Sequence, residues 1–326
     1  MFLFIHGVIA VFIIGYPFTS LISQIIGISI CSFYYYNAVR YVGAIKIFMY
    51  YSEFSFVVAV LGLLMFYCNI TLWDPYRLHS ILSEPSRFAI ILLPSLYYFI
   101  KNKSYLKFSV ILFSIILSQS SIGLIGLLLL IIIPNLGLIK KSLKYIPIFI
   151  ILIFFISKNE HFQIRYNETM SSLSVFSTQK FDRTVNLSSY ALISNTYVSY
   201  SSFKDHFLGT GLGAFETMHD KYLSDLILPY NISANNSQDI NKADANSLFL
   251  RILSDLGIFG LIILIYCSYK FFQVIKNKNK DLTIVYGITV YFLLKLLRQG
   301  HYFPPEFYFF LFIFIFYIKD LKSSLK

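Results

Sequence analysis

The sequence predicts an all-α integral membrane protein, a polytopic bundle of helices. Two observations lead to this prediction. First, 57% of the 326 residues are hydrophobic and only 13% are charged, whereas about 25% of the residues of a soluble domain are charged. Second, the chain repeats apolar runs of helical length. These runs lack the period of two that the strands of a membrane barrel would show.

The apolar runs mark about ten candidate spans. Their approximate boundaries are 1–16, 18–36, 47–68, 87–100, 108–121, 122–139, 145–157, 247–270, 281–297 and 306–319. Several are shorter than the ~20 residues of a perpendicular span and are candidates for broken or re-entrant helices. The only long polar stretch, residues 158–246, predicts a folded loop between spans seven and eight. The chain therefore divides into spans one to seven (1–157), the loop (158–246) and spans eight to ten (247–326).

The positions of the basic residues predict the orientation. If the N-terminus is cytoplasmic, 15 of the 27 basic residues fall on the inner side, as the positive-inside rule requires. The short outer loops then carry only Arg77, Arg87 and Arg298, and the seven basic residues of the long loop are offset by nine acidic ones. We therefore expect both termini to be cytoplasmic and the long loop to be extracytoplasmic. Topology accounts for the net charge of +11, so no nucleic-acid partner is expected.

The arginines are distributed differently from the lysines. The inner basic residues are nearly all lysine, whereas the arginines sit mainly on the outer side, at Arg77, Arg87, Arg165, Arg183, Arg251 and Arg298. Arginine grips phosphate and carboxylate through two parallel hydrogen bonds. The pattern favours an anionic ligand at the outer boundary. The alternative is that these side chains only reach the interface from nearby helices.

The first outer motif follows span three, which itself carries Glu53 as either a functional or a structural carboxylate. Arg77, His79, Glu84 and Arg87 occur within eleven residues, just before an apolar run. Ser83 can cap the next helix, with Pro85 in its first turn, and a helix N-terminus attracts anions. The motif is therefore either an outward-facing acid, base and arginine set or a plain amphipathic turn.

This motif resembles the first outer loop of the O-antigen polymerase (Wzy-type) family, through Arg77, Leu78 and the run Glu84-Pro85-Ser86. Ser80 occupies a position where that family often has glycine. A second, weaker resemblance is the small-residue turn at 118–123, where the family's frequent arginine is absent.

The long loop continues the resemblance. Arg183 precedes a helical segment that leads to Gly209, Gly211 and Gly213, as an arginine and a glycine-rich turn do in the family. A dinucleotide fingerprint would need a strand before this turn and a βαβ context, and neither is visible. The glycines instead predict positive φ and close backbone approach, with amides that can face a phosphate or a sugar.

The loop closes with Asp244-Ala245-Asn246 and then an apolar helix containing Arg251 and Asp255. O-antigen ligases, the sister group, typically have histidine just before this asparagine, so Ala245 favours a polymerase. Arg251 and Asp255 are spaced i, i+4 and can form an intrahelical ion pair. The last outer loop adds Arg298 and His301, which is a candidate base near neutral pH or a surface histidine.

The resemblance implies a GT-C-like bundle in the bacterial inner membrane that acts as a glycosyltransferase. No carboxylate cluster at metal-ligand spacing stands out in the sequence, so we expect a metal-independent enzyme, and we expect no cofactor. The reaction it implies is transfer of a growing glycan from undecaprenyl diphosphate to a lipid-linked repeat unit. Arg77 and Arg183 are expected to stabilise the leaving diphosphate, and Arg251 and Arg298 are further candidates for this role. Glu84 is the first candidate for the base, followed by Asp244 and His301. The expected substrate-binding residues are Arg87, Gly209, Gly211, Gly213, Asp244, Asn246, Arg251, Arg298 and His301.

The expected partners are an undecaprenyl-diphosphate-linked oligosaccharide and membrane lipids, with a chain-length regulator and a flippase as further candidates. Two alternatives stay open. An O-antigen ligase performs the same chemistry on a lipid A–core acceptor. A lipid-linked-oligosaccharide flippase or transporter would show internal repeats or helices broken at the midplane, and no clear repeat is visible.

Overall fold

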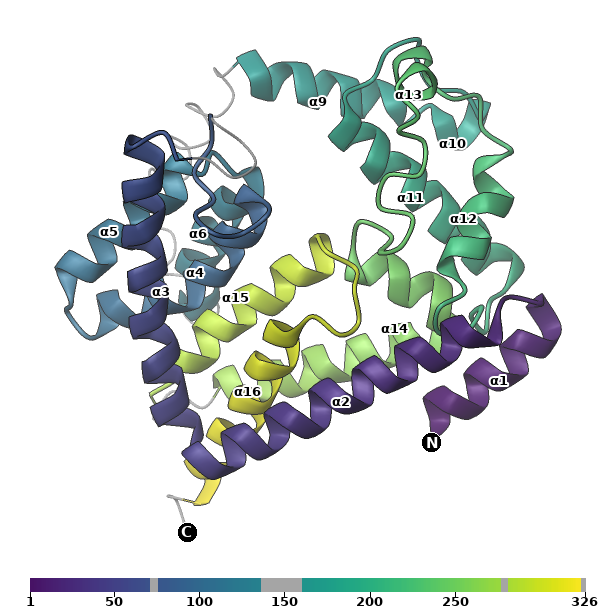
Figure 1. The fold of residues 1–326 in the computed structure, drawn as a ribbon. Helices are drawn as coiled ribbons and strands as arrows, with labels where there is room; N and C mark the ends of the chain where they lie inside the picture. The colour runs from purple at the N-terminus through teal and green to yellow at the C-terminus, as the bar shows by residue number, and fades with distance from the viewer. Residues whose placement is uncertain (71–75, 136–159, 277–280, 324–326) are drawn as a thin grey trace. The chain divides into compact units, whose positions relative to one another are not determined.

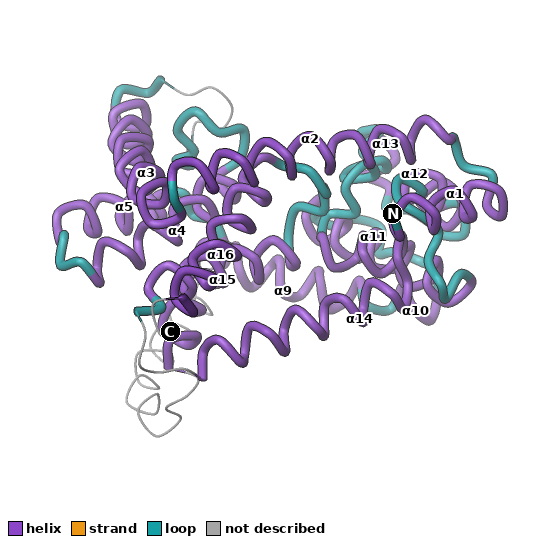
Figure 2. Tube along the Cα trace, turned by 90° about the horizontal axis from the view of Figure 1, so that it is seen from below, coloured by secondary structure: helices purple, strands orange, loops and turns teal. Residues whose placement is uncertain are grey.

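The computed structural model describes residues 1–70, 76–135, 160–276 and 281–323. Regular structure in these ranges is helical, apart from one isolated bridge between Lys180 and Ile227 (Figures 1 and 2). The helices of the first half are α1 (Phe2–Ile14), α2 (Phe18–Val42), α3 (Ala44–Tyr67), α4 (Pro85–Lys101), α5 (Tyr105–Leu117), α6 (Ser121–Ile132) and the 3₁₀ helix η1 (Ile133–Asn135). Those of the second half are α9 (Glu160–Ser172), α10 (Val175–Thr178), α11 (Leu187–Asp205), α12 (Phe215–Leu223), α13 (Tyr230–Ala234), α14 (Leu248–Lys276), α15 (Thr283–Leu297) and α16 (Pro305–Ser323). The span predicted at 145–157 lies outside the described residues.

The chain folds into two compact units. One, the loop unit, comprises residues 1–29, 145–269 and 295–303, and the other, the bundle unit, comprises residues 30–144, 270–294 and 304–326. Each unit is made of several separate stretches of the chain, whereas the sequence predicts three continuous parts with boundaries after residues 157 and 246. The long polar loop therefore shares its unit with α1, the start of α2 and most of α14.

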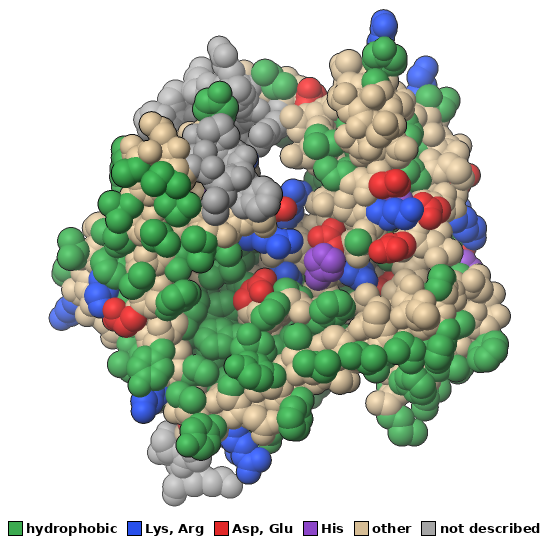
Figure 3. All heavy atoms as spheres, in the orientation of Figure 1, with side chains coloured by type: hydrophobic (Ala, Val, Ile, Leu, Met, Phe, Trp, Pro, Cys, Tyr) green, Lys and Arg blue, Asp and Glu red, His purple; other side chains and the backbone are tan. Residues whose placement is uncertain are grey.

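The bundle unit packs α3, α4, α5, α6 and α16 around an apolar core. Phe88, Leu93 and Phe310 are completely buried in it. Gly126 lies against the side chain of Leu93, and small residues at helix interfaces are typical of membrane bundles because they let helices approach closely. The opposite face of α3 leaves large apolar side chains exposed, and Figure 3 shows a largely hydrophobic surface over α3 and α5. Such a surface suits contact with lipid.

The apolar helices agree with the predicted membrane class. Among the described residues, three helical stretches are long and apolar enough to cross a membrane, namely Phe18–Val42, Ala44–Tyr67 and Leu248–Ile275. Shorter apolar helices cover Phe2–Ile14, Tyr105–Leu117, Ser121–Asn135 and Thr283–Leu297. The protein is thus all-α with several apolar helices, and the number of spans stays a prediction.

The loop unit is built around α11, the helix expected after Arg183. Asn186 caps it, because its side-chain oxygen accepts a hydrogen bond from Ser188 N at 2.9 Å. Helices α9, α10 and α12 pack against α11. The side chains of Tyr190, Val198 and Phe215 form part of a separate apolar core. The polar loop is therefore a folded body with its own core, as its mixed composition indicated.

Helix α14 is broken at Gly257, whose φ of 55° and ψ of −134° are not helical. The glycine turn packs at this break. Gly211 N donates to Asp255 O at 2.8 Å, and Ile258 N donates to Phe207 O at 3.0 Å. The φ values of Gly209, Gly211 and Gly213 are 95°, 90° and 87°. The predicted positive φ and close backbone approach are both confirmed, and they join the polar loop to α14.

Candidate functional site

Four of the predicted residues of the loop unit, Asp244, Asn246, Arg298 and His301, meet where the 244–247 turn contacts the 298–303 segment. The turn begins at Asp244, whose Oδ1 accepts a hydrogen bond from Asn246 N at 3.0 Å. Ala245 and Asn246 follow in the left-handed conformation, with φ of 57° and 60°. Two consecutive non-glycine residues in this region are unusual and are typical of functional sites where surrounding contacts impose the conformation.

Asn246 is the centre of this cluster. Its buried side-chain oxygen accepts hydrogen bonds from Arg298 Nη1 at 2.7 Å and from Asn241 Nδ2 at 2.8 Å. Its backbone oxygen accepts from Gln299 N at 3.0 Å. Asn246 therefore fixes both the guanidinium of Arg298 and the backbone that follows it. We call Asp244, Asn246, Arg298 and His301 the Asn246 cluster.

The cluster contains an acid–histidine pair. His301 Nε2 lies 3.9 Å from Asp244 Oδ2, and their side chains are 42% and 13% exposed. A carboxylate beside a histidine orients the ring and stabilises its protonated form. The exposed ring can reach a ligand, while Asp244 stays mostly covered. The pair can accept a proton from a hydroxyl group placed next to the ring.

Arg251 supports the cluster from within the protein. It is only 3% exposed, its Nη1 donates to Gly300 O at 3.4 Å, and its guanidinium lies 4.7 Å from the ring centre of Tyr302. Tyr302 in turn donates to Arg251 O at 3.3 Å. Gly300 is required, because a Cβ there would overlap the carbonyl oxygen of Asp244. Through these contacts Arg251 anchors the segment that carries Arg298 and His301, and its expected role in substrate binding stays a prediction.

The glycine turn does not direct its amides toward a ligand. Gly209 N donates to His206 O at 2.8 Å, Gly211 N to Asp255 O at 2.8 Å, and Gly213 N to Asp255 Oδ2 at 3.3 Å. The expectation that these amides face a phosphate or a sugar is therefore corrected. Their acceptors lie at the break of α14, so the glycines secure the loop to that helix.

Three of the predicted residues lie in the bundle unit, and there Arg77 fastens the turn between α5 and α6. Its Nε donates to Ser118 O at 3.3 Å and its Nη2 to Gln119 O at 3.4 Å. That turn is confirmed: Gln119 has a φ of 47°, and Ser120 caps α6 by accepting from Gly123 N.

Glu84 and Arg87 lie at the start of α4. Glu84 is exposed at the N-cap position, and its Oε2 accepts from Ser86 Oγ at 2.8 Å. Ser83 does not cap this helix as expected, because the cap falls one residue later, directly before Pro85. Arg87 is half-buried.

Arg183 lies apart from the Asn246 cluster. It lines a depression of about 810 Å³ formed by α10, residues 180–183 and residues 227–233, and none of the cluster residues lines it. Glu53, left open as a functional or structural carboxylate, pairs with Lys107, whose Nζ lies 2.5 Å from Glu53 Oε2. This ion pair supports the structural alternative for Glu53.

One group in the loop unit has metal-ligand chemistry. Donor atoms of His219, Asp220 and Asp239 lie within 4.8 Å of one another. The ammonium of Lys242, however, lies 2.5 Å from Asp220 Oδ1 and 3.9 Å from Asp239 Oδ1. A lysine thus already supplies the positive charge that these carboxylates attract. Burial lowers the pKa of His219, which favours its neutral form.

Sequence reasoning missed several residues that build the site. Asn241, Gln299 and Tyr302 all contact the cluster or its support. The available signal was their position next to residues already singled out, at 244–246 and 298–301. Nothing in the spacing indicated that these two segments meet.

Residues 106–265 match the Wzy_C family model, described as O-antigen ligase. The match includes Arg183, the glycine turn, Asn246 and Arg251, whereas Arg298 and His301 follow it. No curated protein and no solved structure matches the chain.

Proposed function

Residues 106–265 carry the O-antigen ligase domain that Wzy polymerases and O-antigen ligases share, and from this premise we propose that the chain is a repeat-unit polymerase. The domain makes the chain a membrane enzyme of the ligase and polymerase type, acting in surface polysaccharide assembly. We propose the finer reaction, in which a growing glycan moves from undecaprenyl diphosphate to an incoming lipid-linked repeat unit. It takes place at the extracytoplasmic face of the bacterial inner membrane, with both termini cytoplasmic.

In this reaction a sugar hydroxyl of the acceptor attacks the anomeric carbon of the donor. A new C–O bond forms, and the bond from that carbon to the diphosphate breaks. The electron pair of the broken bond leaves with undecaprenyl diphosphate, and the hydroxyl proton passes to a base. The enzyme must therefore supply a base on one side and positive charge on the other.

The observation that carries the proposal is the Asn246 cluster. His301, beside Asp244, is the base in place of Glu84, because its ring is accessible and has a carboxylate partner. Arg298 is held by Asn246 at 2.7 Å and supplies a pre-oriented guanidinium for the diphosphate, since a fixed donor needs no reorganisation as charge develops. Arg77, Arg87 and Glu84 remain candidates for contacting the lipid-linked substrates from the bundle unit.

A ligase is the second candidate, and one observation favours it. The chain has Ala245 where ligases typically place histidine, yet His301 brings an imidazole to within 3.9 Å of the neighbouring Asp244. The two enzymes differ in the acceptor, which is a lipid-linked repeat unit for a polymerase and lipid A–core for a ligase. The products in cells therefore distinguish them.

The test is the surface-glycan ladder of a deletion strain. We expect the deletion to leave lipid A–core capped by a single repeat and the wild-type gene to restore the ladder. His301→Gln should not restore it, whereas the matched control His206→Gln, a half-buried histidine of the same unit outside the cluster, should. Membrane insertion is checked by immunoblot. Loss of every repeat in the deletion strain, including the single one, would overturn the polymerase and support a ligase.

A further inference from the structure

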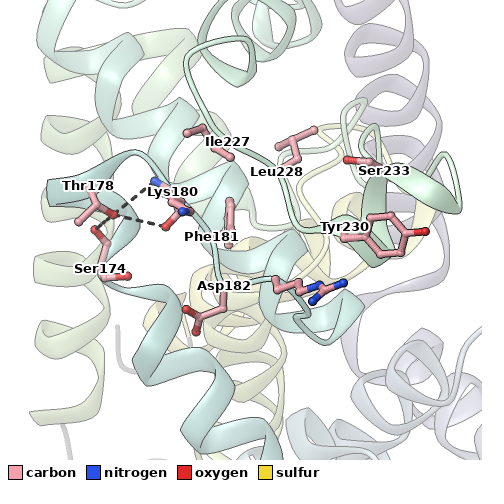
Figure 4. Close-up of a pocket in the computed structure, with 10 residues that line it drawn as sticks. Ser174, Thr178, Lys180, Phe181, Asp182, Ile227, Leu228, Tyr230 and Ser233 are labelled. Carbon is pink, nitrogen blue, oxygen red and sulfur yellow. Dashed lines mark hydrogen bonds between the residues drawn. The ribbon is translucent and has the colours of Figure 1, made fainter.

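The depression that contains Arg183 is a second polar site of the loop unit. Its volume of about 810 Å³ falls in the range of ~300–1,000 Å³ that ligand sites of proteins occupy. Figure 4 shows Lys180 and Tyr230 on its walls, with Asp182 pointing away from Tyr230. No residue of the Asn246 cluster lines it, so the proposed transfer reaction leaves this site without a role.

The walls of the depression are held in place by backbone pairing. Phe181 N donates to Ile227 O at 3.1 Å, and Tyr230 N donates to Arg183 O at 2.9 Å. The side chain of Phe181 is buried in the core of the unit. Asn231 adds a clamp, because its amide donates to Val185 O at 2.9 Å and accepts from Val185 N at 3.2 Å. The backbone of the site is therefore preformed, and a ligand would have to order only the side chains that it contacts.

The side chains that face the depression combine two kinds of recognition. Tyr230 is 68% exposed and Ile227 60% exposed, so an aromatic ring and an aliphatic group stand open to solvent. Within the described part of the chain, the side chains of Lys180 and Arg183 make no hydrogen bond or ion pair with the protein. Two uncommitted cations beside an exposed ring suit a ligand with both an apolar face and an anionic group.

We propose that this depression binds a segment of acidic glycan, an oligosaccharide that carries carboxylates on its sugar rings. The C–H face of a pyranose ring packs on Tyr230, and the carboxylate binds Lys180 and Arg183. Hydroxyl side chains at the rim, such as Ser233, bond to sugar hydroxyls. The inference rests on the proposed polymerase function, in which such a glycan is the growing chain. The site would hold that chain between transfer steps.

Binding is tested with the strain's own surface glycan, released from the cells by mild acid. Purified full-length protein in lipid nanodiscs is titrated with this glycan and with the same glycan after chemical reduction of its carboxyl groups. We expect Tyr230→Ala to weaken binding of both glycans by about threefold to tenfold, the effect of one aromatic contact. Lys180→Gln should weaken binding of the native glycan but not of the reduced one.

Matched controls come from the same unit. Tyr200 and Lys204 are exposed residues of α11 that do not line the depression, so Tyr200→Ala and Lys204→Gln should bind like wild type. A second readout is the glycan ladder, which Tyr230→Ala should shift to shorter chains.

Each contrary result has a distinct meaning. Equal binding of native and reduced glycan to wild-type protein, or a native glycan that contains no acidic sugar, overturns the acidic ligand. Wild-type binding and wild-type chain length for Tyr230→Ala overturn the site itself, while the polymerase can stand. A deletion strain that still makes a ladder overturns the polymerase, while binding to the depression remains measurable.

Discussion

Arg251 and Asp255 lie one turn apart on α14 and form an ion pair inside the protein, with Arg251 Nε 3.6 Å from Asp255 Oδ2. The i, i+4 spacing predicts the pair, and the structure adds that the two side chains are only 3% and 0% exposed. Each partner also holds a different segment. Arg251 contacts Gly300 O and the ring of Tyr302, and Asp255 accepts from Gly213 N. The pair joins both segments to one helix.

Removing one member of this pair should destabilise the protein strongly. A buried charge without its partner costs about 3–5 kcal/mol, whereas replacing both charges with apolar groups is nearly neutral. We expect Arg251→Met and Asp255→Leu each to lower the melting temperature of the purified protein, and the double variant to recover most of the loss. Thermal unfolding in detergent measures this double-mutant cycle. If the fall in melting temperature of the double variant equals the sum of the two single falls, Arg251 and Asp255 are not energetically coupled and the prediction is wrong.

The same double variant separates stability from activity. Arg251 also anchors the segment carrying His301, so the recovered protein should still fail to restore a full glycan ladder. A ladder like that of wild type from the double variant would show that Arg251 does not position the site.

Gly300→Ala should disable the Asn246 cluster. The added Cβ would overlap the carbonyl oxygen of Asp244, so either the 298–303 segment or the 244–247 turn must move. We expect loss of the glycan ladder together with a lower melting temperature. The control is Gly15→Ala, where a Cβ meets nothing within 4 Å and only the positive φ is strained, at about 1 kcal/mol. A normal ladder from Gly300→Ala would contradict the close contact.

Arg298→Lys should reduce activity although the charge is kept. The guanidinium of Arg298 is oriented by Asn246 Oδ1 at 2.7 Å, and a lysine cannot reproduce its planar fork of donors. We expect a fall in the rate of glycan transfer in a purified assay of about 10²-fold or more, the effect of removing one oriented donor. Asn246→Ala should act in the same direction, and its effect should largely disappear when lysine is already present at 298.

The stability of the loop unit should depend on pH through His219. The pKa of this histidine is lowered, mainly by burial. The nearby carboxylates of Asp239 and Asp220 act in the opposite direction, and the ammonium of Lys242 lowers the pKa further. In the unfolded chain the pKa is about 6.5, so the unfolded state binds more protons below that pH. The free energy of unfolding should therefore fall as the pH falls through about 6.5 and level off below the folded pKa.

The measurement compares melting temperatures of wild type and His219→Leu between about pH 7.5 and 5. The variant should lose part of the pH dependence. The remainder includes His206, whose pKa burial also lowers. An unchanged pH dependence in His219→Leu would contradict this account.

Local features of the loop unit follow from the sequence. Glycine at 209, 211 and 213 predicts positive φ because a side chain disfavours that conformation, and all three positions have it. The helix after Arg183 and the tight turn at 118–123 are likewise properties of short segments. The prediction that Ser83 caps α4 is wrong by one residue. The helix begins at Pro85, so the residue directly before it, Glu84, takes the N-cap position.

The site itself could be predicted only in part. The sequence predicts Asp244 and Asn246 from the motif that closes the long loop, and Arg298 and His301 from the last outer loop. The sequence does not indicate that Arg298 binds Asn246 across 52 positions, because such a contact depends on how distant segments pack. For the same reason the sequence does not indicate that Arg183, which it predicts to contact the leaving diphosphate, lines a depression separate from the Asn246 cluster.

The sequence by itself determined that this is a helical membrane protein with a folded polar loop. Composition and the spacing of apolar residues are properties of each segment and do not depend on which distant segments pack together. It also supplied the residue types for glycosyl transfer. The tertiary structure decided which of them meet. Helix α14 breaks at Gly257 and receives the glycine turn, so those amides bind protein atoms instead of a ligand. Packing between distant segments then made Arg251 a buried anchor and left His301 exposed beside Asp244.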